Sequence, residues 1–73
     1  MIITINSNGK NIDIKVNEKL KINDAIDILN ECGLINRSER LIVKTYRDKR
    51  VVSLDESFEK NEILNGDILE IRE

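Results

Sequence analysis

The fold is decided by the stretch Leu64-Asn65-Gly66-Asp67-Ile68-Leu69-Glu70-Ile71-Arg72-Glu73. Asn-Gly is a strong turn signal because both residues accept positive φ angles. After the turn, Leu69 and Ile71 alternate with Glu70 and Arg72, which is the period of a strand with one core face. The stretch therefore predicts a tight turn into a strand over residues 68–71. We expect the chain to end on this strand, without a free tail.

A hairpin is predicted at the opposite end of the sequence. Met1, Ile3 and Ile5 alternate with polar residues, and the same period of two continues after the turn. The two runs flank Asn8-Gly9, the strongest short-range signal for a hairpin. One face of the hairpin is aliphatic and the other polar, so we expect it to be covered on one side only.

A helix is expected to supply this cover, because the next apolar residues recur at helical spacing. They are Ile22, Ala25, Ile26, Leu29 and Cys32. Asp24 and Asp27 lie in the early turns, where the helix dipole favours negative charge, and Gly33 suits the left-handed position after a helix. Asn23 is chemically suitable as the N-cap, although Ile22 already belongs to the apolar stripe.

The second half of the sequence predicts a third strand that begins at 41–43, a charged turn at 46–50 and a short strand at 51–52. We expect core contacts from Phe58, Ile63 and Leu64 before the final turn. Neither a linker nor an internal repeat interrupts residues 1–73, which predicts one domain. The predicted class is α+β: a mixed four- to five-stranded sheet with one main helix packed across one face.

This order of elements is typical of the β-grasp fold, and the residues resemble those of ubiquitin in detail. The likeness is carried by Met1-x-Ile3-x-Ile5, Gly9-Lys10, Ile12-x-Ile14-x-Val16, Arg40-Leu41-Ile42 and the segment 54–71. Among ubiquitin-like proteins, the chain is most similar to the small bacterial YukD/EsaB type, which also ends shortly after a Gly-Asp-x-Leu strand, here Gly66-Asp67-Ile68-Leu69. The pattern is one of core positions, so it speaks for fold more than for activity.

The YukD/EsaB resemblance implies a non-enzymatic protein that acts through protein–protein contacts, as a cytoplasmic accessory or regulator of type VII (WXG100) secretion. A ubiquitin-like adaptor or subunit of another bacterial assembly is the alternative. A covalent modifier or sulfur carrier would need a C-terminal Gly-Gly pair. The sequence closes instead on Ile71-Arg72-Glu73.

The composition argues against two classes of partner, nucleic acids and membranes. The formal net charge is −2, which argues against nucleic acid. No apolar run is long enough to insert into a membrane. We expect a cytoplasmic protein in a reducing environment, because Cys32 is the single cysteine and cannot form an intramolecular disulfide. The YukD/EsaB resemblance implies that the protein is bacterial.

Chemistry at a catalytic, cofactor or metal site is not expected. A nucleophilic Cys32 would need a nearby cation or base, yet the sequence has no histidine and a helix C-terminus disfavours a thiolate. A core or boundary thiol is the favoured interpretation of Cys32. Asp24 and Asp27 are explained equally well as a solvated helix face, and acidic residues nowhere follow the spacing of a calcium loop.

A candidate partner-binding surface emerges from the charge pattern. Residues 37–50 carry a local charge of +4 and residues 55–73 one of −5, and we expect the two segments to lie side by side and partly neutralise each other. The candidate partner-binding residues are Ile42, Lys44, Arg47, Lys49 and Arg50. The turn at 47–50 is either a docking site for an acidic partner surface or a solvated loop with cross-strand ion pairs to Glu70.

Ile42 falls at a strand position that contributes to the aliphatic binding patch of ubiquitin, and both surface contact and ordinary packing remain open for it. Glu70 and Arg72 replace the rest of that patch, so ubiquitin receptors are not expected to bind. The sequence leaves the oligomeric state open, with an edge strand near Val51-Val52 able to pair with another copy.

Overall fold

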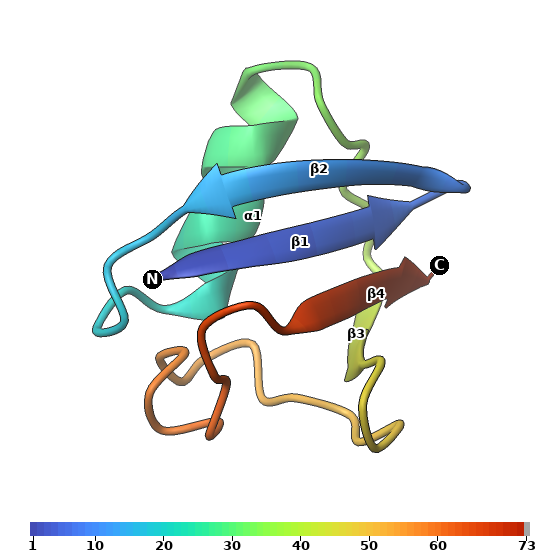
Figure 1. Cartoon of the computed structure of the whole chain (residues 1–73). Coiled ribbons are helices and arrows are strands. Elements are labelled where there is room, and N and C mark those ends of the chain that lie inside the picture. The colour runs from blue at the N-terminus through green and yellow to red at the C-terminus, as the bar shows by residue number, and fades with distance from the viewer. Residues whose placement is uncertain (73) are drawn as a thin grey trace.

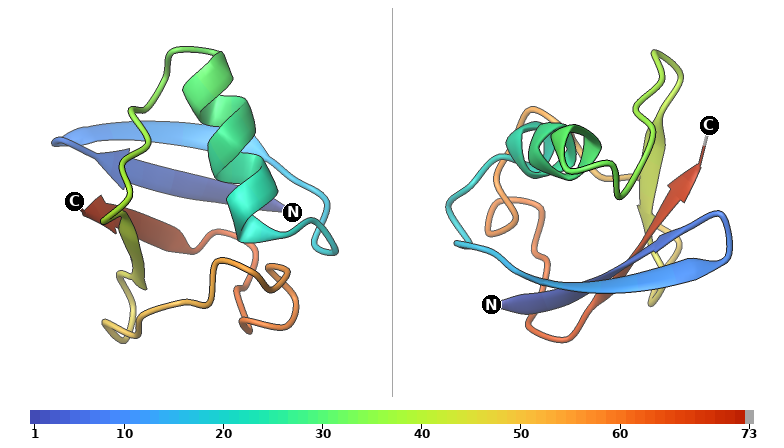
Figure 2. Two further views of the ribbon diagram at one scale, coloured as in Figure 1. Left: turned by 180° about the vertical axis from the view of Figure 1, so that it is seen from behind. Right: turned by 90° about the horizontal axis from the view of Figure 1, so that it is seen from above.

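The computed structural model describes residues 1–72 and contains one helix and one four-stranded sheet (Figure 1). The elements follow the order β1 (Ile2–Ser7), β2 (Lys10–Lys15), α1 (Ile22–Glu31), β3 (Ile42–Thr45) and β4 (Ile68–Arg72). The strands lie in the order β2-β1-β4-β3, with β1 and β4 parallel and the other two pairs antiparallel. The helix crosses one face of the sheet (Figure 2). The predicted α+β architecture is confirmed.

The fifth strand that the sequence allowed does not form within residues 1–72. Val51 makes only an isolated bridge with Lys44, while Val52 is buried in the core. The turn at 46–50 returns the chain to β3 for only one residue pair, which is too few to form a fifth strand. The sheet is therefore four-stranded, with β2 and β3 at its edges.

The hairpin turn is the one that the sequence predicts. Asn8 and Gly9 both have positive φ angles, 52° and 76°, as a two-residue hairpin requires. This turn fixes the register of β1 against β2, in which Ile3 lies opposite Ile14 and Ile5 opposite Ile12. The aliphatic residues of both strands therefore share the face that the helix covers.

The final strand, β4, enters the centre of the sheet beside β1. Gly66 has a φ of 87°, and its N–H donates to the carbonyl of Ile2 over 2.7 Å. The side-chain oxygen of Asn65 accepts the N–H of Ile2, also over 2.7 Å. Ile71 is packed in the sheet as predicted. The expectation that the chain stops at Glu73 lies outside the described residues.

The helix buries the predicted stripe up to Leu29, but not beyond it. Ile22, Ala25, Ile26 and Leu29 face the core. Cys32, expected in the core or at its boundary, is exposed, because it is the C-cap residue and the chain turns away after it. Gly33 takes the left-handed conformation, with a φ of 75°, as predicted. The helix starts after Lys21, and no side chain caps it, so Asn23 lies inside the helix.

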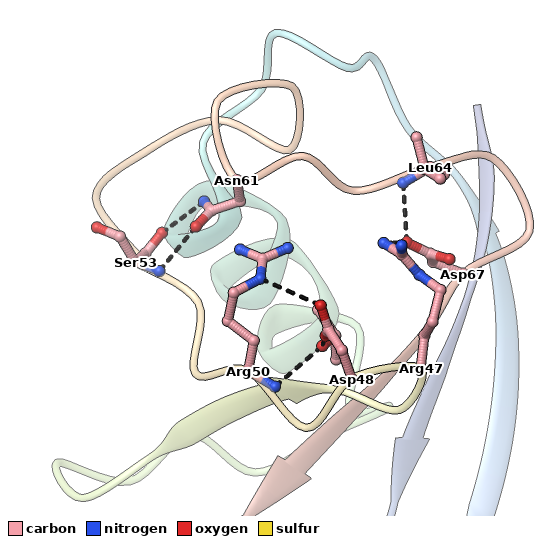
Figure 3. Close-up of polar contacts among 8 residues, drawn as sticks. Arg47, Asp48, Arg50, Ser53, Asn61, Leu64 and Asp67 are labelled. Atoms are coloured by element: carbon pink, nitrogen blue, oxygen red, sulfur yellow. Dashed lines mark hydrogen bonds and ion pairs between the residues drawn. The ribbon is translucent and has the colours of Figure 1, made fainter.

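One hydrophobic core lies between the helix and the sheet, and Phe58 and Ile63 belong to it as predicted. Leu64 does not: its side chain is 56% exposed. Its backbone N–H donates to the carboxylate of Asp67 over 2.9 Å, which closes the turn before β4 and leaves the side chain outside (Figure 3). Membrane-spanning helices are absent from the described residues, since α1 is too short and too polar.

The long connection between β3 and β4 is held by a buried amide. Asn61 accepts the N–H of Ser53 over 2.8 Å and donates to the carbonyl of Ser53 over 2.8 Å (Figure 3). It also donates to the carbonyl of Ser57 over 2.9 Å. These bonds tie together two parts of a segment that has no regular structure. The connection therefore has a defined shape, and it delivers the chain to the turn before β4.

Candidate functional site

The five candidate residues gather at one edge of the sheet. Ile42 and Lys44 belong to β3, and their side chains point away from the core that Val43 and Thr45 enter. We call the sheet surface opposite the helix the outer face. On it, Ile42 lies across from Arg72 and Lys44 across from Glu70. Arg47, Lys49 and Arg50 follow in the adjoining turn. The structure thus brings the predicted residues together on β3, β4 and one turn.

The turn is built around a buried threonine. The Thr45 N–H donates to the carbonyl of Arg50 over 2.9 Å, and the Thr45 hydroxyl accepts the N–H of Arg50 over 3.1 Å. The same hydroxyl donates to the carboxylate of Asp48. This hydrogen bond is the main reason why the pKa of Asp48 lies below its usual value, with further help from the charge of Arg50. Asp48 therefore stays ionised and holds the turn closed.

The positive charges of the turn are paired rather than free. The ammonium of Lys49 lies 2.9 Å from the Glu70 carboxylate, and Arg47 lies 3.2 Å from Asp67. Arg50 lies 3.6 Å from Asp48 within the turn (Figure 3). The ion pair to Glu70 that the solvated-loop interpretation includes is therefore present. The basic and acidic segments lie side by side as expected.

Glu70 is the electrostatic centre of this region, because it is only 9% exposed although it carries a charge. The hydrogen bond from Lys49 lowers the pKa of Glu70, and the positive charges of Lys49 and Arg72 add to the effect, whereas burial opposes it. Arg72 lies 3.6 Å from the same carboxylate. Glu70 is therefore an ionised anchor that draws two basic side chains toward the outer face.

Tyr46 is the residue that the sequence analysis missed. It is 55% exposed, and the Lys49 ammonium sits 4.3 Å from the centre of its ring. Its backbone N–H donates to the carbonyl of Ile68 over 2.9 Å, which extends the β3–β4 ladder by one residue. Continuing the alternation of Ile42 and Lys44 by one step would have placed Tyr46 on the outer face.

A shallow hollow of about 280 Å³ lies beside Tyr46 on the outer face. Its lining comes from three adjacent strands and the residue after β3, and consists of Asn6, Asn11, Ile68, Glu70 and Tyr46. Ile42, which the sequence left between contact and packing, is 45% exposed on the same face. The outer face therefore exposes two apolar side chains, those of Tyr46 and Ile42, with charged side chains around them.

The described residues hold no group of three or more side chains suited to a metal ion. The lowered pKa values of Asp48 and Glu70 are explained by hydrogen bonds and ion pairs of the fold. The arrangement at β3 and β4 presents an exposed aromatic ring, an exposed aliphatic side chain and paired charges on one surface.

Comparisons with known proteins bear on the fold. No protein-family profile and no curated protein matches the sequence. Among solved structures, an N-terminal ubiquitin-like domain has a TM-score of 0.76 at 10% identity, over 99% of this chain and 72% of that one. A structure described as molecular mimicry of SUMO that promotes DNA repair has a TM-score of 0.83 at 11% identity, over 100% and 90% of the two chains.

The third similar structure is bacterial. The EccD5 ubiquitin-like domain from Mycobacterium xenopi has a TM-score of 0.70 at 18% identity, and the match covers 97% of this chain and 90% of that chain. At these identities the likeness concerns the backbone and the order of elements. Together with the mixed sheet and the crossing helix, it establishes that this chain has the ubiquitin-like β-grasp fold.

Proposed function

We propose that this protein is a non-enzymatic interaction module that binds a partner protein through the outer face of β3 and β4. The observation that carries the proposal is the exposed ring of Tyr46, which directly follows β3, is tied to β4 by its backbone N–H and is in contact with the Lys49 ammonium. An exposed aromatic residue with a fixed backbone is an effective anchor, because it buries much area and loses little conformational freedom on binding. Ile42, the first residue of β3, supplies a second apolar contact on the same face.

The charges around these two residues favour a partner with an acidic rim. Five basic side chains, those of Lys44, Arg47, Lys49, Arg50 and Arg72, surround three carboxylates, those of Asp48, Asp67 and Glu70, which leaves a net charge of +2. Lys44 makes no ion pair with any residue of the described part of the chain. Its ammonium is available to a partner carboxylate, whereas the paired cations fix the shape of the surface.

For the biological setting, we propose a bacterial, cytoplasmic accessory or regulatory component of a type VII (WXG100) secretion system. The resemblance to YukD/EsaB-type proteins supports this setting, and so does the mycobacterial EccD5 domain among the similar structures. A ubiquitin-like adaptor or subunit of another bacterial assembly is the second candidate, since it would use the same kind of surface. The identity of the partner separates the two.

We do not propose covalent conjugation or sulfur transfer for residues 1–73. Those reactions need a Gly-Gly pair, and the printed sequence contains none. Incubation with an activating enzyme and ATP, followed by mass spectrometry, tests this point. A C-terminal adenylate, thiocarboxylate or isopeptide would contradict the non-enzymatic, non-conjugating proposal.

The interaction proposal is tested by affinity capture from the native cytoplasm with the wild-type chain and two variants. Tyr46→Ala removes the proposed anchor, and Leu34→Ala removes an equally exposed apolar side chain from the loop that follows α1. We expect Tyr46→Ala to lose the partner and Leu34→Ala to retain it. Equal capture by all three chains would refute the outer face as the binding surface. Recovery of secretion components would support the type VII setting.

A further inference from the structure

The free edge of β2 is a second surface with unusual self-complementarity. Val16 exchanges both of its backbone hydrogen bonds with Met1, each 2.9 Å long. Because hydrogen-bonding direction alternates along an antiparallel strand, Ile14 and Ile12 also point their backbone groups toward β1. The N–H and C=O groups of Asp13 and Lys15 consequently point away from the sheet. An edge strand with such groups is a template for a further strand.

An apolar groove adjoins this edge on the helix side. It has a volume of about 390 Å³ and runs between β2 and α1. The apolar side chains that line it are Ile14, Val16, Leu20, Ala25, Ile28 and Leu29. Ile28 is exposed, because it lies on the flank of α1 that no described element covers. A strand added to β2 would place every second side chain over this groove.

We propose that the occupant is β2 of a second copy of this chain, paired antiparallel about a two-fold axis that passes beside Ile14. In this register Asp13 of each copy lies opposite Lys15 of the other, and Ile14 lies opposite Ile14. Asp13 and Lys15 both point their backbone groups outward, so the two symmetry-related pairs form a regular ladder. The result is a continuous eight-stranded sheet with both helices on one face.

The charges select this register over its neighbours. Moving the axis by one residue places either Asp13 opposite Asp13 or Lys15 opposite Lys15, and like charges directly opposite each other destabilise a strand pair. Moving it by half a residue pairs groups that point outward with groups that point toward β1, so no ladder forms. The antiparallel complement of Asp13-Ile14-Lys15 is the segment itself, which is why we assign the edge to a second copy.

The apolar side chains agree with the same register. Ile12 of one copy lies opposite Val16 of the other, and the two Ile14 side chains meet at the axis on the helix side. These side chains cover the end of the groove that opens at the strand edge, next to Ile28. Charged pairs therefore lie on the outer face of the joined strands and aliphatic contacts on the inner face, as in an ordinary sheet.

Charge reversal supplies the test. Asp13→Lys places lysines opposite each other in both symmetry-related pairs, and Lys15→Asp does the same with aspartates. We expect sedimentation from micromolar to millimolar concentration to show a wild-type dimer, and each single variant to weaken dimerisation about tenfold or more. An equimolar mixture of the two variants restores both opposite-charge pairs, so we expect it to form a heterodimer.

Matched controls are Glu59→Lys and Lys60→Asp, which make the same charge changes at exposed positions outside β2, in the connection before β4. We expect both to dimerise like the wild type. Hydrogen exchange at millimolar concentration gives an independent readout, with the amides of Asp13 and Lys15 protected only in the dimer. A wild-type chain that stays monomeric, or a dimer that both single variants retain, would overturn the proposal. The charged residues of β2 would then serve only to keep the edge unpaired.

Discussion

The buried amide of Asn61 allows a sharp test of what holds the connection between β3 and β4. Asn61 is 6% exposed and makes three hydrogen bonds of 2.8 to 2.9 Å with the backbone of Ser53 and Ser57. Asn61→Ala removes all three, together with a longer contact of 3.4 Å to the carbonyl of Glu56. The Ser53 N–H then has no partner, whereas the carbonyls of Ser53 and Ser57 keep their backbone N–H donors. A typical net value of about 1 kcal/mol for each bond gives a loss of about 3 kcal/mol in the free energy of unfolding.

For a domain of this size, such a loss lowers the midpoint of thermal unfolding by about 10–25 °C. Circular dichroism during heating and urea titration at pH 7 measure both quantities. Asn11→Ala is the matched control, because Asn11 makes one exposed side-chain bond, to Asn6. We expect the control to change the free energy of unfolding by less than about 0.5 kcal/mol.

Asn61→Asp separates the donor from the acceptor role of the amide. The aspartate keeps an oxygen for the N–H of Ser53 but turns a carboxylate toward two carbonyls, which raises its pKa in the folded state. The variant should therefore gain stability, relative to the wild type, as the pH falls and the carboxyl group becomes protonated. A loss below about 1 kcal/mol for Asn61→Ala would refute the reasoning, because water would then satisfy the backbone groups that the amide binds in the wild type.

Three further perturbations address the sheet and its turns. Glu70→Gln removes a carboxylate whose pKa is lowered in the folded state. The variant should therefore be less stable than the wild type above the ordinary carboxyl pKa, and the difference should vanish as the pH falls through the lowered value. Urea titrations at neutral and acidic pH measure this difference. Gly66→Ala places a Cβ in open space at a φ of 87°, so calorimetry should show a purely conformational cost of about 1 kcal/mol. Leu69→Ala empties a fully buried site in β4 and should cost about 2–5 kcal/mol, measured by urea unfolding; a smaller loss would contradict tight packing there.

The sequence was most informative where one local rule governs the structure. Asn8-Gly9 determines a two-residue turn, the turn determines the register, and the register determines which side chains meet the helix. The stripe from Ile22 to Leu29 is equally local, because helical spacing alone brings its members to one face. Gly33 then ends the helix for a conformational reason that is visible in the sequence.

Errors arose where burial depends on how distant segments meet. Cys32 continues the helical spacing, but Leu29 is the last residue of α1 that packs in the core, and Cys32 at the C-cap is exposed. Leu64 is apolar and follows Ile63, yet Asp67 draws its backbone into a turn and leaves the side chain in solvent. Asn61 gave no signal at all, since a buried amide looks like a surface residue until its three partners are known.

At the candidate surface, the ion pair to Glu70 could be predicted from the sequence, whereas the contact between Lys49 and Tyr46 could not. Ion pairing to Glu70 follows from placing a basic turn beside an acidic strand. The stacking of Lys49 on Tyr46 depends on the left-handed backbone of Lys49, with a φ of 57°, which turns its side chain back toward the sheet. A lysine in that conformation cannot be foreseen from its residue type.

The central position of β4 has a consequence for biosynthesis. Within this domain, β4 is the last strand to be translated, although it lies between β1 and β3. A nascent chain that lacks it has two separated pieces of sheet, and Ile3 and Ile5 have no strand on one side. The domain should thus acquire its native structure in a single late step after translation of β4, and its chaperone dependence would be concentrated in that brief interval.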